Sequence, residues 1–64
     1  MEKFKIQAYS RDMKELLFEF EKEHEEVGTA LLEACSMAYH DRIIVLWVDS
    51  KLDSGRYRLV AKFY

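Results

Sequence analysis

The chain has 64 residues, of which 50% are hydrophobic and 34% are charged, and its formal net charge is −2. A chain of this length forms one domain at most, here residues 1–64, and buries only about 60% of its unfolded surface. The composition is too apolar for a disordered protein. The longest apolar run, the six residues from Ile43 to Val48, is too short to cross a bilayer, so we expect no membrane association.

A core this small usually needs a disulfide, a metal or another subunit to stabilise it. Cys35 is the single cysteine, so no internal disulfide can form. The spacing of His24, Cys35 and His40 matches no zinc pattern, so no metal is expected. We therefore predict a homo-oligomer, with a dimer as the favoured stoichiometry. A lone thiol and an N-terminus without an apolar signal core favour a cytoplasmic location.

The first predicted element covers residues 3–9, "KFKIQAY". Its apolar residues Phe4, Ile6 and Ala8 alternate with polar residues. Strict alternation is typical of a half-buried strand.

From Met13 the apolar residues recur at helical spacing, alternately four and three residues apart. The residues on this stripe are Met13, Leu17, Phe20, His24, Val27, Leu31, Ala34 and Ala38. Asp12 offers an N-cap, and Glu15 completes a capping box. We predict one helix over residues 12–39, bent at Gly28, with two helices in line or an additional strand in residues 29–40 as the alternatives.

The run 42–48, "RIIVLWV", is a strand without alternation, which is typical of a central strand. The turn formers of residues 50–55 follow it, and residues 56–64 alternate again. The two strands are predicted to form a hairpin. In the second strand, we expect the apolar set Tyr57, Leu59, Ala61 and Phe63 to face the helix.

These elements define an α+β fold of order β-α-β-β, with a three-stranded antiparallel sheet and one long helix on one face. The order of elements resembles that of the dodecins, small flavin-storing oligomers. The resemblance is one of topology only, because the helix here is longer and Trp47 lies inside a strand. No cofactor or site residue is carried over from that family.

The face of the sheet away from the helix is the main candidate for an interaction site. An apolar ridge of Ile43, Val45 and Trp47 would run through it, or else the alternate set Ile44, Leu46 and Val48. Such a ridge in a polar rim marks a binding surface. The expected rim residues are Tyr9, Arg56, Arg58, Lys62 and Tyr64. A second copy, another protein or a nucleic acid could cover the ridge, since bases stack on aromatic side chains while basic groups contact phosphates.

Residues 11–41 carry nine acidic residues against three basic ones. Glu15, Glu19 and Glu23 are four residues apart, which is unfavourable between like charges in a helix. This acidic surface is either a solvated face or a docking site for a basic partner, such as the basic sheet face of another copy. It could also imitate nucleic acid in the groove of an enzyme.

No catalytic arrangement is expected. No histidine or acid is placed to activate Cys35, and no glycine-rich loop could hold a phosphate. We predict a cytoplasmic, non-enzymatic protein-binding or regulatory module without cofactors that acts through a self-associating interface. An inhibitor of a host protein, of the kind carried by phages and mobile elements, is one form of it. The alternative is a nucleic-acid-binding oligomer that uses the basic and aromatic sheet face.

Overall fold

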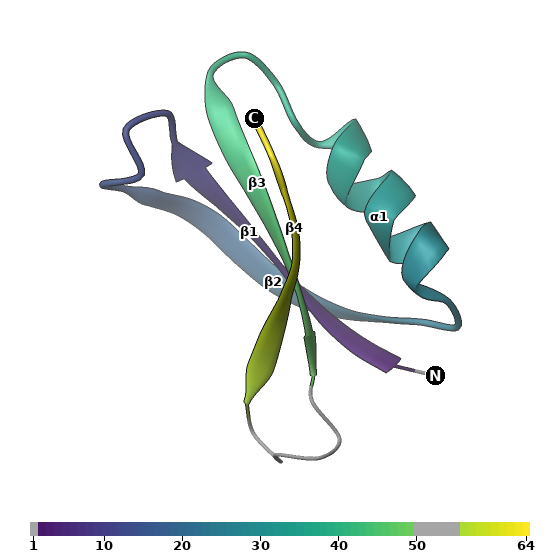
Figure 1. Ribbon diagram of the computed structural model, residues 1–64. Coiled ribbons are helices and arrows are strands. Elements are labelled where there is room, and N and C mark those ends of the chain that lie inside the picture. Colours follow the sequence, from purple (N-terminus) through teal and green to yellow (C-terminus); the bar gives the residue numbers. More distant parts are fainter. Residues whose placement is uncertain (1, 50–55) are drawn as a thin grey trace.

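The computed structural model describes residues 2–49 and 56–64, which form four strands and one helix. The elements are β1 (Glu2–Ser10), β2 (Leu16–His24), α1 (Val27–Ser36), β3 (Arg42–Asp49) and β4 (Tyr57–Phe63). The strands form one sheet in the order β2-β1-β3-β4, and every neighbouring pair is antiparallel. The helix covers one face of the sheet (Figure 1). The α+β class is therefore confirmed, as is the predicted β3–β4 hairpin, whose turn in residues 50–55 lies outside the described residues.

The long helix expected over residues 12–39 is wrong. Residues 16–24 form strand β2, and the helix covers only Val27–Ser36. The order is β-β-α-β-β with four strands, so the topological resemblance to dodecins does not hold. Nor does Gly28 bend a helix, because it is the second residue of α1.

The charges of β1 and β2 explain why residues 16–24 form a strand. Glu21 and Glu23 of β2 lie opposite Lys5 and Lys3 of β1 in the antiparallel register, and Glu19 lies opposite Gln7. Opposite charges on directly paired residues stabilise a sheet. In a helix the same glutamates would be repelled by like charges four residues away. In the strand, contacts between glutamates are therefore replaced by contacts between glutamates and lysines.

The β1–β2 turn occupies the position where we expected a helix N-cap. Asp12 does not cap a helix, since its Oδ1 accepts a hydrogen bond from the backbone N–H of Lys14 at 3.0 Å. The N–H of Met13 donates to the carbonyl of Ser10 at 2.8 Å, and Met13 has a φ of 63°. Few non-glycine residues adopt this left-handed conformation. The turn contains neither glycine nor proline, so its sequence carries no strong turn signal.

The hydrophobic core lies between the sheet and α1. Phe4, Ile6 and Ala8 of β1 are buried as predicted, and Ile44 and Leu46 of β3 lie beside them. Strand β3 lies inside the sheet, between β1 and β4, which agrees with its unalternated sequence. The buried residues of α1 are Ala30 and Ala34, so the helix contacts the sheet through its smallest side chains.

A β-bulge in β4 corrects the predicted facing of that strand. Leu46 pairs with Ala61 but Trp47 pairs with Leu59, so Val60 is the additional residue. Ala61 and Phe63 face the helix as expected, whereas Tyr57 and Leu59 share the opposite face with Trp47 and Asp49. Val60 packs against the core, and Arg58, paired with Val48, lies on the helix side as well.

Polar contacts join α1 to β2. The Glu33 carboxylate of α1 lies 3.1 Å from Lys22 Nζ and 2.7 Å from His24 Nε2. His24 is packed, as expected, with its ring edge-on to Phe4 at 5.9 Å between centroids. Burial raises the pKa of Glu33, but the hydrogen bonds and charges of Lys22 and His24 outweigh it and lower the pKa below its usual 4.5.

We expect Glu33→Gln to lower the free energy of unfolding near neutral pH by about 0.5–1 kcal/mol, because the carboxylate is partly exposed. A carboxylate with a lowered folded-state pKa stabilises the fold above its unfolded pKa, and this contribution disappears as the pH falls through the folded pKa. Urea titrations of both proteins should therefore converge once the pH is below the folded-state pKa of Glu33, which itself lies below 4.5. Glu25→Gln, at an exposed position, is the control. A Glu33→Gln deficit that persists in acid would contradict the contact.

Candidate interaction surfaces

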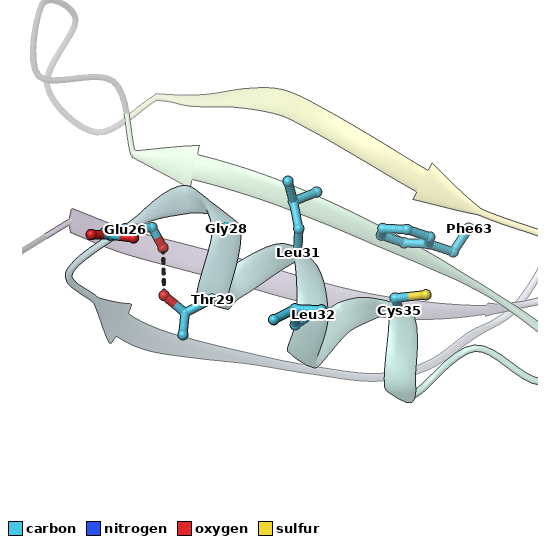
Figure 2. A pocket seen from close by; sticks show the side chains of 7 residues that line it. All are labelled: Glu26, Gly28, Thr29, Leu31, Leu32, Cys35 and Phe63. Carbon is cyan, nitrogen blue, oxygen red and sulfur yellow. Dashed lines mark hydrogen bonds between the residues drawn. The ribbon is translucent and has the colours of Figure 1, made fainter.

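An apolar groove separates α1 from β4. Its volume is about 690 Å³, and Figure 2 shows Leu31 of α1 and Phe63 of β4 on its two sides. The complete lining is Glu26, Gly28, Thr29, Leu31, Leu32, Cys35 and Phe63. The helix α1 is ten residues long, and Glu33 joins it to Lys22 of β2.

The two adjacent leucines of α1 differ in exposure. Leu31 packs against the core, while Leu32 is 73% exposed. Cys35 is exposed beside the groove. An apolar surface open to solvent in this way is typical of an interaction site. Sequence reasoning missed it, although adjacent leucines on a short helix cannot both face the same sheet.

The outer edge of β4 adjoins this groove and is basic. Strand β4 is an edge strand, so its outer backbone groups have no neighbouring strand among the described elements. Leu59 is 50% exposed. Arg58 and Lys62 make no ion pair with any residue in the described ranges. An open edge with apolar side chains is a template for pairing with another strand.

The opposite face of the sheet, which we call the open face, carries a hydrogen-bonded network centred on Gln7. The Oε1 atom of Gln7 accepts hydrogen bonds from Trp47 Nε1 at 2.7 Å and from the Tyr9 hydroxyl at 3.2 Å. Its Nε2 atom donates to Glu19 at 2.9 Å. One glutamine therefore links strands β1, β2 and β3.

Charged and aromatic groups extend this network. Lys3 Nζ lies 3.4 Å from the Glu21 carboxylate, and Lys5 Nζ lies 4.5 Å from the Tyr57 ring centroid. A hydrogen bond from Tyr57 and then the contact with Lys3 lower the pKa of Glu21. Burial, followed by the hydrogen bond to Glu21 and the nearby charges, raises the pKa of Tyr57 to about 12. Tyr57 therefore keeps its proton through the physiological pH range.

The predicted ridge needs no partner to cover most of it. Val45 is 1% exposed and Ile43 is 4% exposed within the single chain, and Trp47 is half-buried. The expectation that the ridge would be bare on its own is therefore wrong. Long polar side chains from the neighbouring strands cover a face that has no helix, because each lies beside the ridge in the register.

The other predicted interaction residues do not form one rim. Tyr9 belongs to the Gln7 network, while Arg56 and Tyr64 flank β4, with Tyr64 75% exposed. Glu15 lies in the β1–β2 turn and Glu19 on the open face. The structure thus divides these residues between the open face, the β4 edge and the β1–β2 turn.

The open face carries both signs of charge. Glu19, Glu21 and Glu23 of β2 lie directly opposite Gln7, Lys5 and Lys3 of β1. This row of carboxylates would repel phosphates. The open face is therefore not uniformly basic.

Within residues 2–49 and 56–64, no group of three or more histidine, cysteine or acidic residues is placed to hold a metal ion. No helix there is long and apolar enough to cross a membrane.

The fold and its surfaces define a small α+β protein with a four-stranded antiparallel sheet, one covering helix and an open apolar groove beside an edge strand. No protein-family model, curated protein or solved structure gives a significant match to the chain.

Proposed function

We propose that this chain is a non-enzymatic protein-binding module of the cytoplasm that associates with copies of itself through α1 and β4. The observation that carries the proposal is the apolar groove between these elements, in which Leu32 is 73% exposed. Burying an apolar surface contributes about 25 cal/mol per Å². Association would also stabilise this small fold, because only folded molecules can associate and the folding equilibrium then shifts towards them.

The site we propose differs from the one expected from the sequence. The ridge on the open face is largely buried by its own chain, so the groove and the β4 edge are the apolar surfaces that a partner can reach. A role as an inhibitor of a host protein stays a prediction from the size and composition of the chain. The groove would serve such a role by presenting the same apolar surface to a different protein.

Leu32→Glu tests the proposal, because it places a charge in the middle of the expected contact. Removing a central apolar anchor costs about 2 kcal/mol or more, so we expect association to weaken at least about thirtyfold. Light scattering over a concentration series measures this change. Met13→Glu is the matched control, since Met13 is 41% exposed in the β1–β2 turn and does not line the groove.

Circular dichroism should show that both variants remain folded, because both positions are exposed. If Leu32→Glu and the unmodified chain associate equally well, the groove is not the contact. If Met13→Glu weakens association as strongly as Leu32→Glu, added negative charge is responsible and not the groove.

A further inference from the structure

The two edges of the sheet carry opposite charges. Strand β2 holds Glu19, Glu21 and Glu23 against Lys22, whereas β4 holds Arg58 and Lys62 and no acidic residue. Both strands are edges, one on each side of the sheet. They also run in opposite directions, because β2 is parallel to β3 and β4 is antiparallel to it. A second molecule placed beside the first in the same orientation would therefore join β2 to β4 as an antiparallel pair.

The register places matching residues at the same level on the two edges. Two adjacent rows, read from β2 to β4, are Phe18, Ala8, Ile44, Phe63 and then Glu19, Gln7, Val45, Lys62. The first row lies on the helix side and the second on the open face. If β2 of a second molecule pairs with β4 so that these rows stay aligned, Phe18 of the second molecule lies beside Phe63 and its Glu19 lies beside Lys62.

We propose that the occupant of the β4 edge and its groove is the β2 strand of a second copy of this chain. The inference rests on the proposed self-association and specifies its geometry. Main-chain hydrogen bonds would join the two edges, and opposite charges would set their register. On the helix side, Phe18 would lie at the Phe63 end of the groove. Leu16, which pairs with Tyr9 on the open face, would add exposed apolar surface at the same end of the contact.

One contact in this arrangement is between like charges. The row that contains Lys22 also contains Phe4, Val48 and Arg58, so Lys22 would approach Arg58. Lys22 is already paired with Glu33 at 3.1 Å, which offsets its charge. Glu23 is adjacent to Lys22 and therefore lies on the open face, so it does not offset this contact.

A contact between two different edges has a consequence for stoichiometry. Each molecule keeps one free edge after pairing, so the assembly closes only as a ring and otherwise extends. A symmetric contact between two β4 edges would instead stop at the dimer expected from the sequence. The two arrangements also differ in whether β2 takes part.

Charge reversal at the matched pair separates these outcomes. Lys62→Glu and Glu19→Lys should each weaken association roughly fivefold or more, since an exposed charge pair is replaced by like charges. The double variant restores opposite charges at the contact and should recover most of the lost association. Met13→Lys is the control for adding a positive charge outside the contact. Sedimentation velocity measures association, and Trp47 fluorescence reports whether each variant is folded.

Glu19→Lys decides between the arrangements. If the unmodified chain associates but Glu19→Lys has no effect, self-association stands and a β2–β4 contact is overturned. If each single variant weakens association and the double variant is weaker still, the charges do not meet and the proposal fails. If the unmodified chain remains a monomer, the proposed function fails with it.

Discussion

Phe4→Ala is expected to lower the free energy of unfolding by about 3–5 kcal/mol, the cost of deleting a buried phenylalanine ring. Phe4 is 0% exposed and lies in the core between β3 and α1, where its ring also meets His24. A chain of this length has a total stability of roughly 3–10 kcal/mol. The substitution therefore removes a large share of it, and much of the variant should be unfolded at room temperature.

Urea denaturation followed by Trp47 fluorescence measures this loss. Phe63→Ala is the matched control, because Phe63 lies on the same side of the sheet but only half-buried at the groove. We expect it to cost about 1–2 kcal/mol, since a ring that is still partly exposed contributes less burial. Equal losses at the two positions would contradict the placement of the core under α1.

Val45→Asp is expected to lower the free energy of unfolding by more than about 3 kcal/mol, because it places a carboxylate at a buried apolar position. Val45 is 1% exposed although it lies on the face that has no helix. Gln7 and Lys62 are its neighbours in the register. The result thus tests whether the open face is closed by its own chain.

Leu59→Asp provides the control for Val45→Asp. Leu59 lies on the same face but is 50% exposed, so its substitution should cost at most about 1 kcal/mol. Val45→Thr is a milder variant that should remain folded, with a loss of about 1–2 kcal/mol for the buried hydroxyl. If Val45→Asp and Leu59→Asp lower the free energy of unfolding equally, Val45 is not buried by its own chain.

The sequence predicts those elements in which the spacing of the apolar residues and the residue types of the flanking turns indicate the same structure. The alternation of Phe4, Ile6 and Ala8 predicts β1, and the apolar run from Ile43 predicts a central strand. Both are confirmed. The hairpin of β3 and β4 was predictable for the same reason, because two strand patterns flank a stretch of turn-forming residues.

Strand β2 was misread because two periods coincide in it. Leu17, Phe20 and His24 are spaced as on a helix, but residues 18–24 also alternate strictly between the two faces of a strand. The like charges at Glu19 and Glu23 were the signal that favoured the strand. Their pairing with β1 favours the strand over a helix. Local propensity does not include this pairing, because the paired residues lie on two strands separated by a turn.

The interaction site was only partly predictable. Alternation places Val45 on the second face but does not show that Gln7 and its partners cover it. The groove lies between α1 and β4, which come together only when the helix packs on the sheet. This arrangement follows from tertiary packing, so Leu32 and Phe63 emerge as neighbours of one groove only in the folded chain.

Sedimentation velocity of the unmodified chain, from low micromolar to millimolar concentration, tests self-association most directly. We predict a sedimentation coefficient that rises with concentration and falls again when salt is added, because the contact joins charged edges as well as apolar side chains. A constant coefficient, matching a 7.7 kDa monomer at every concentration, would contradict the account.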